Sequence, residues 1–524
     1  MNNAAGMKNL LTRLLSLRSL GIFAVIVYIG MSAFAVQVML IKRDGLSFHQ
    51  KDYSYFIEQA ARLADPGLTK RYATNIEGYN FIGLQGIEGA YSIFQAIHNE
   101  YFRYTYAALY LIFQTTLPIY IFYALVFYLP VLYCTWAARP ATLQARLFIL
   151  GFILLYVFYP GEAQAAANDL RARFLLPAAW CMAVMSVYYE RPFAEKLVCL
   201  AFLPFLREEG IVLGLIVTAL NFLRMRGKPG RVFQTRVFLA LIFLALAAFV
   251  VFMYWGGYRQ IDSQYNPLNV FNILFRSPIL VLILALLIAV AVVVIIRISR
   301  QPERLNGALF WLGYASIFGL TGAQFLRDFT FWYGRALAQQ PVSALDIYQY
   351  TLTGDTFYTM YVVSIALLPL AGAAIAQRWR KPLLFAEGLL ACLMIATAVI
   401  NLPPQVDAWR TRIPPARLVW DFKAQHDRYH TRILVDFNTY QAFYNVENVL
   451  VYNRVPVWMV GPNHLRDRFY PQDKDLVAKA IAGGIEYAVI GRESLADVQE
   501  LAQLSGRQAL EIASNATYLI LQFR

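Results

Sequence analysis

The chain has 524 residues, of which 59% are hydrophobic and only 15% are charged, and its mean hydropathy is +0.47. Soluble globular proteins carry about 25% charged residues, so this composition excludes a soluble protein and predicts an integral membrane protein whose partner is the lipid bilayer. The net charge of +14 comes mainly from short basic clusters beside apolar runs. Clusters in such positions are membrane topology signals, and we expect no nucleic-acid partner.

The apolar runs between residues 19 and 401 are long enough, or nearly long enough, to span a bilayer. They predict an all-α polytopic bundle of about eleven transmembrane helices, at residues 19–41, 105–135, 147–160, 174–189, 197–206, 211–223, 237–255, 277–296, 308–325, 357–376 and 383–401. The stretch 197–224 leaves two alternatives open, because Arg207-Glu208-Glu209 either separates two short helices or interrupts a single span.

Basic residues cluster before the first predicted span and after every second one. With an odd number of spans all these clusters fall on one side of the membrane, which the positive-inside rule makes the cytoplasm. The N-terminus is then cytoplasmic, and the region after the last span is extracytoplasmic. The clusters lie at residues 8–18, 139–146, 191–196, 224–236, 297–304 and 378–381.

The composition changes after the last span, so we expect a transmembrane domain at residues 1–401 and a small extracytoplasmic α/β domain at residues 402–524. Pro403-Pro404 stands at the predicted exit from the membrane. Short runs rich in β-branched residues then alternate with helical stretches, which is typical of an α/β layer domain. The expected strands are Ile433–Phe437, Val449–Tyr452, Val455–Val460, Ala488–Ile490 and Tyr518–Phe523, and the expected helices are Asp473–Ala482 and Ser494–Leu504.

The long loop between the first two spans, residues 42–104, is the most informative segment for function, because loops of this length are usually functional or structured. Apolar residues recur every three or four positions from Asp52 to Leu63, which predicts an amphipathic helix with Asp52 as its N-cap. Asp52 also stands where a carboxylate at the membrane surface can take a proton from an acceptor hydroxyl. A second amphipathic stretch, Glu88–Tyr101, carries His98, whose alternative role is interfacial packing.

Several features of the chain resemble the GT-C superfamily of polytopic membrane glycosyltransferases. The chain is more similar still to a related bacterial and archaeal family of uncharacterised membrane proteins with that architecture. The features are the long loop after the first span, an early acid within it (Asp44, or Asp52 in Lys51-Asp52-Tyr53), the run from Asn80 to His98, and Arg207-Glu208-Glu209-Gly210 opening a helix. The resemblance covers most of the membrane region.

This resemblance implies a cell-envelope glycosyltransferase of glycan or polysaccharide biosynthesis in a bacterial or archaeal plasma (inner) membrane. The donor would be a sugar linked to polyprenyl phosphate and the acceptor a glycan, a lipid or a protein, with transfer on the extracytoplasmic face. The expected general base is Asp52 or Asp44. The expected donor-phosphate ligands are Arg207, Arg173 and Arg171. The candidates for a second acid or for substrate binding are Glu208, Glu209, Glu162, Asp169, Glu88, His98 and Glu100.

Asp44 and Asp52 are eight residues apart, so no acidic pair suited to metal binding follows the first span. No cofactor is therefore assigned, and dependence on a divalent cation, Mg or Mn, stays open. Two other classes of function also stay open: a transporter or flippase for a lipid-linked glycan, and a non-catalytic scaffold with the GT-C architecture. An internal repeat would favour a transporter, and we find no convincing repeat in the sequence.

Overall fold

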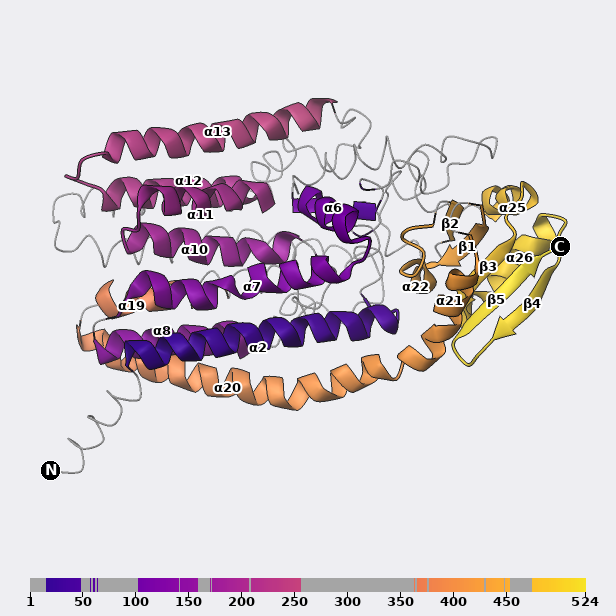
Figure 1. Ribbon diagram of the computed structural model, residues 1–524, viewed down its shortest axis with the longest axis horizontal. Helices are drawn as coiled ribbons and strands as arrows, with labels where there is room; N and C mark the ends of the chain where they lie inside the picture. Colours follow the sequence, from indigo (N-terminus) through magenta and orange to yellow (C-terminus); the bar gives the residue numbers. More distant parts are fainter. Residues whose placement is uncertain are drawn as a thin grey trace, which may run out of the picture.

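Helices lie side by side along the long axis of the molecule, and a small sheet domain sits at one end of them (Figure 1). The computed structural model describes residues 16–48, 57, 60, 61, 64, 102–140, 142–158, 170, 172–206, 209–255, 362, 365–374, 377–427, 430–446, 448–452 and 474–524. The predicted spans 277–296 and 308–325 and the predicted strand Val455–Val460 lie outside these residues.

The helical part is an integral membrane bundle. Large apolar side chains are exposed along its outer helices, for example Ile26 at 64%, Phe243 at 69% and Phe385 at 75%. Four described helices are long and apolar enough to cross a membrane, which confirms the predicted class of protein. The described helices of the bundle are α2 (Leu17–Asp44), α6 (Phe102–Phe113), α7 (Leu117–Ala138), α8 (Leu143–Phe158), η2 (Ala172–Leu175), α10 (Leu176–Tyr188), α11 (Phe193–Leu206), α12 (Glu209–Arg224), α13 (Arg231–Trp255), α19 (Leu368–Ala374) and α20 (Gln377–Arg410).

The single span predicted at residues 105–135 is wrong, because two helices, α6 and α7, occupy it. Gln114 takes a left-handed backbone conformation with a φ of 51°, and Pro118 lies in the first turn of α7. Proline has no N–H, and its ring collides with the carbonyl of residue i−4, so a continuous helix through this position is disfavoured. The break holds only three residues, Gln114-Thr115-Thr116, which are polar but uncharged, so a hydropathy window averages over it.

The stretch at residues 197–224 forms two helices, α11 and α12, which resolves the alternatives left open by the sequence. A Cβ atom at Gly210 would collide with the carbonyl oxygen of Leu203. The start of α12 therefore packs directly on the last turns of α11, and only glycine fits at that contact.

Helix α20 is longer than the predicted span 383–401 and continues through Pro403-Pro404 to Arg410. Its 34 residues correspond to roughly 51 Å at 1.5 Å per residue, which exceeds the ~30 Å hydrocarbon core of a bilayer. Figure 1 shows its last part curving toward the sheet domain. Prolines inside a helix remove backbone hydrogen bonds and permit such a bend.

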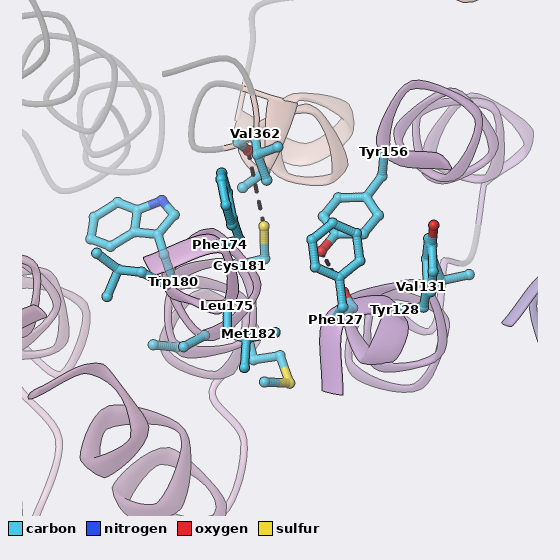
Figure 2. Close-up of a cluster of buried hydrophobic side chains, with 14 of the residues drawn as sticks. Phe127, Tyr128, Val131, Tyr156, Phe174, Leu175, Trp180, Cys181, Met182 and Val362 are labelled. Carbon is cyan, nitrogen blue, oxygen red and sulfur yellow. Dashed lines mark hydrogen bonds between the residues drawn. The ribbon is translucent and has the colours of Figure 1, made fainter. Parts of the chain in front are cut away.

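The middle of the bundle is filled by large side chains from α7, α8 and α10 (Figure 2). The Tyr156 hydroxyl donates to the carbonyl oxygen of Phe127 at 2.5 Å, so a polar group is satisfied inside this apolar cluster. Trp180 is fully buried nearby. The described part of the bundle thus forms a packed scaffold.

The C-terminal domain has a mixed five-stranded sheet in the order β2-β1-β3-β5-β4. Strand β1 pairs in parallel with β2 and β3, whereas β5 pairs antiparallel with β3 and β4. Helices α25 and α26 cover one face of the sheet, and α21 covers the other. The elements are α21 (Ile413–Gln425), β1 (Arg432–Asp436), α22 (Phe437–Tyr440), β2 (Asn448–Tyr452), α25 (Lys474–Ala482), β3 (Tyr487–Gly491), η6 (Arg492–Ser494), α26 (Leu495–Leu504), β4 (Ala509–Ser514) and β5 (Tyr518–Phe523).

Asp436 joins the ends of the two central strands. Its carboxylate accepts hydrogen bonds from the backbone N–H and hydroxyl of Thr439, from the N–H of Gly491 and from the hydroxyl of Ser494. These hydrogen bonds bridge the carboxyl ends of β1 and β3, the edge at which ligands of open α/β sheets usually bind. The candidate site lies on the side of the domain that meets the bundle, where Trp420 and Gln441 contact the chain after α2.

Candidate functional site at the junction of bundle and domain

The two ends of the bundle differ in charge. Arg139 and Arg191 lie over the ring of Trp136 at 5.2 and 4.8 Å, and Glu190 pairs with Arg224 at 3.1 Å. These contacts bring three of the predicted basic clusters to one end of the bundle. Arg380, in the cluster at 378–381, lies within electrostatic range of Tyr188 at the same end. We call this the basic end; it is opposite the α/β domain (Figure 1).

Asp44 is the last residue of α2 and lies at the other end, where the bundle meets the α/β domain. Its carboxylate pairs with the guanidinium of Arg43 at 2.6 Å, and the two side chains are 43% and 29% exposed. The indole N–H of Trp420, on α21, donates to the Asp44 carbonyl oxygen at 3.1 Å. A candidate catalytic acid is thus accessible while its backbone is held by the domain.

The chain leaves α2 at Asp44, and we call residues 44–48 the junction segment. Leu46 is 3% exposed and belongs to the core of the α/β domain, whereas Phe48 is 3% exposed and belongs to the core of the bundle. Gln441 of the domain hydrogen-bonds to the backbone of both residues. The junction segment is therefore shared between two hydrophobic cores.

A buried cation lies beside the junction segment. Lys42 is 2% exposed, and its ammonium lies 5.1 Å from the ring of Phe48 and 5.0 Å from the ring of Trp409. Rings within about 6 Å attract a cation through their quadrupole. Lys42 and Arg43 thus place two positive charges at the end of α2. Neither residue is among the donor-phosphate ligands predicted from the sequence.

The far end of the first loop returns to the same domain. Tyr110, on α6, meets Tyr444 edge to face at 6.2 Å between ring centroids, and the Asn445 side-chain amide donates to the Tyr110 hydroxyl at 3.4 Å. Burial raises the pKa of the Tyr444 hydroxyl, the neighbouring tyrosines add to this effect, and the charge of Arg43 opposes it. Tyr444 is therefore a neutral hydroxyl at physiological pH.

Of the other predicted site residues, the structure places only two backbones. Arg173 lies in η2, and Glu209 is the first residue of α12. The remaining candidates lie outside the described residues, and their roles stay predictions; they are Asp52, Arg207, Arg171, Glu208, Glu162, Asp169, Glu88, His98 and Glu100. Within the described part of the chain, no three or more His, Cys, Asp and Glu residues gather where they could hold a metal ion.

A buried carboxyl inside the bundle is not among the site residues predicted from the sequence. Glu387, on α20, is 4% exposed and lies against Gly151 of α8, where a Cβ atom would collide with the carboxyl group. Among the described residues, neither oxygen of Glu387 has a hydrogen-bond partner. A glutamate within a predicted transmembrane run is itself a signal, and residue 387 falls inside the predicted span 383–401.

Comparison with known proteins gives structural likenesses alone. No family model and no curated protein matches the chain. The structure is similar to ArnT from Cupriavidus metallidurans in the apo state, with a TM-score of 0.42, 12% identity and coverage of 94% of this chain and 98% of that one. It is also similar to ArnT from the same organism bound to undecaprenyl phosphate, with a TM-score of 0.44, 13% identity and coverage of 95% of this chain and 97% of that one.

Both identities are below 25% and both TM-scores are below 0.5, so these likenesses assign this chain to no superfamily. At TM-scores below 0.5 such a likeness assigns no activity.

Proposed function

We propose that the chain is a membrane glycosyltransferase that transfers a sugar from a polyprenyl-phosphate-linked donor to an acceptor at the domain end of the bundle. The observation that carries this proposal is the position of Asp44. It ends an apolar helix of 28 residues, its side chain is 43% exposed, and Arg43 and Lys42 lie beside it. An acid and the partly exposed Arg43 thus lie together at the domain end of the bundle, where we propose that a lipid-borne phosphate ester binds, and the buried Lys42 adds positive charge behind them.

The positive-inside rule assigns the basic end of the bundle to the cytoplasm. The α/β domain and the junction segment are then extracytoplasmic, as expected from the sequence. Nucleotide sugars are absent from that side of the membrane, so a donor carried by a lipid must supply the sugar. Such a donor enters from the bilayer, between helices.

The proposed chemistry needs a base and a stabilised leaving group. The carboxylate of Asp44 or Asp52 takes a proton from an acceptor hydroxyl while the hydroxyl oxygen forms a bond to the anomeric carbon of the sugar. The bond from that carbon to the phosphate oxygen breaks, and polyprenyl phosphate leaves with the electron pair. Cations at the membrane surface stabilise the leaving phosphate, a role for which Arg43 joins the predicted Arg207, Arg173 and Arg171.

The test is a transfer assay with the full chain reconstituted in nanodiscs and a panel of radiolabelled polyprenyl-phosphate sugars. We expect Asp44→Asn or Asp52→Asn to lower kcat by about 10²–10⁴-fold, the usual contribution of a general base. Asp407→Asn is the matched control, since Asp407 lies at the end of α20 with a side chain 69% exposed. Its activity should equal that of the unmodified protein.

Full activity in both acid variants would remove the proposed base. Binding of polyprenyl phosphate without transfer from any donor would instead support the non-catalytic scaffold. Movement of the intact lipid-linked glycan across the membrane would support the flippase.

A further inference from the structure

The junction segment has a backbone that its own sequence does not favour. Leu46 takes a left-handed conformation with a φ of 49°, which is uncommon for a branched side chain. Conformations of this kind persist only where the surrounding contacts hold them, and they concentrate at functional sites. The contacts around the junction segment must therefore hold Leu46 in this conformation.

Gln441 supplies most of these contacts. Its side-chain oxygen accepts the N–H of Phe48 at 3.1 Å, and its amide nitrogen donates to the carbonyl oxygens of Leu46 at 3.3 Å and Phe48 at 3.1 Å. The side chain is 3% exposed. Because water cannot replace these partners at a buried position, the amide fixes both the register and the direction of the backbone.

Two further contacts tie the domain to the same loop. Trp420 donates to the carbonyl oxygen of Asp44, two residues before the left-handed Leu46. Tyr444 and Asn445 contact Tyr110, which follows the first loop. The domain therefore contacts the chain where the first loop starts and soon after it ends.

We propose that Gln441 is a positioning residue for sugar transfer: it fixes the junction segment, and thereby Asp44 at the start of that segment, relative to the bundle. This role rests on the proposed function, because it concerns the placement of Asp44. The α/β domain is then part of the catalytic apparatus through its contact with the loop, without touching the reacting atoms.

The test uses the full chain in nanodiscs and compares Gln441→Met with Gln503→Met. Methionine has a similar length and no amide, so Gln441→Met leaves the backbone groups of Leu46 and Phe48 without their partner. Gln503 is exposed on α26 of the same domain. Hydrogen exchange of peptides covering residues 44–48 reports the contact, and initial rates against donor concentration report catalysis.

We expect exchange of the Phe48 amide to become about tenfold faster in Gln441→Met, as for a lost hydrogen bond. We also expect kcat to fall by about tenfold or more, because misplacement of a reacting group lowers the rate of the chemical step. The KM for the donor should stay within about twofold, since the donor-binding groups are unchanged. Gln503→Met should alter neither readout.

Trp420→Phe provides a second variant if Gln441→Met does not fold. It keeps a ring in place of the indole, which also contacts Lys423, and it removes the bond to the Asp44 carbonyl, so both effects should appear in the same direction and be smaller. Unchanged exchange in both variants overturns the proposal, and so does faster exchange with an unchanged kcat. If the unmodified protein transfers no sugar, the proposed function fails together with this catalytic role, and the exchange data then show whether the contact itself exists.

Discussion

The two ends of the helical bundle are held together by different interactions. At the basic end, Glu190 pairs with Arg224 and Lys228, and the three side chains are between 21% and 42% exposed. At the domain end, the contacts come from the buried Leu46 and the buried neutral amide of Gln441. Exposed ion pairs contribute about 0–1 kcal/mol and weaken in salt, whereas apolar burial is insensitive to salt screening.

The difference shows that the two ends of the bundle place different demands on the precision of their contacts. The positive-inside rule relates charges such as those at the basic end to orientation in a membrane, and an approximate arrangement of charges is sufficient for that role. Packing at the other end fixes the geometry of a short backbone segment, which demands specific partners. Substitutions at the domain end should therefore have larger effects than substitutions at the basic end.

Leu46→Ala should have the largest effect. Deleting a buried leucine side chain costs about 2–5 kcal/mol, and here the lost contacts join the domain to the bundle. The measurement is the free energy of unfolding of the domain in mixed micelles, with Leu504→Ala as control because Leu504 is 53% exposed. A loss of equal size in both variants would contradict the shared core.

Asp436→Asn should have the next largest effect. The substitution turns an amide N–H₂ toward groups that donate to the carboxylate, such as the N–H of Gly491, and an unsatisfied buried group costs about 1–3 kcal/mol. Asp421→Asn, at an exposed position of α21, is the matched control. Equal stability of the two variants in thermal unfolding would show that the bridge between β1 and β3 contributes nothing.

Glu190→Gln should have a small effect that depends on salt. Removing the ion pairs at the basic end should cost no more than about 1 kcal/mol in low salt. The difference from the unmodified protein should vanish near 1 M salt, where the screening length is about 3 Å. Thermal unfolding at two salt concentrations checks this; a difference that persists in high salt would contradict the exposed character of the pair.

The same glutamate gives a pH dependence with a definite sign. Burial acts to raise the pKa of Glu190, but the hydrogen bond from Lys228 and the charge of Arg224 outweigh it, so the pKa lies below 4.5. A lowered pKa stabilises the folded state above pH 4.5, and this contribution is lost as the pH falls through the folded value. Hydrogen exchange of the turn between α10 and α11 should therefore report loosening in acid, and Glu190→Gln should abolish that response.

Sequence patterns predict the parts of the fold that depend on local signals. The apolar runs locate α2, α13 and α20, and the strand at residues 518–523 follows from its apolar pattern. They miss β4, because it is an edge strand whose side chains are mostly exposed. They also end α20 too early at Pro403-Pro404, where contacts in the folded protein override the local preference against proline.

The candidate site was less predictable. Asp44 carries a sequence signal, an acid at the end of an apolar run, and the structure places it at the junction. Gln441 carries none, because its partners Leu46 and Phe48 lie 395 and 393 positions away in the chain. A contact of that kind exists only after folding, so no local pattern can reveal it.

Photocrosslinking with a polyprenyl phosphate tests the central claim most directly. The probe carries a diazirine on the isoprene unit next to the phosphate and is added to the full chain in nanodiscs, and the labelled peptides are identified by mass spectrometry. The account predicts labelling at the end of α2, in peptides covering Lys42–Phe48, and competition by unlabelled polyprenyl phosphate. Labelling confined to the basic end, around Arg139, Arg191 and Arg224, would contradict it.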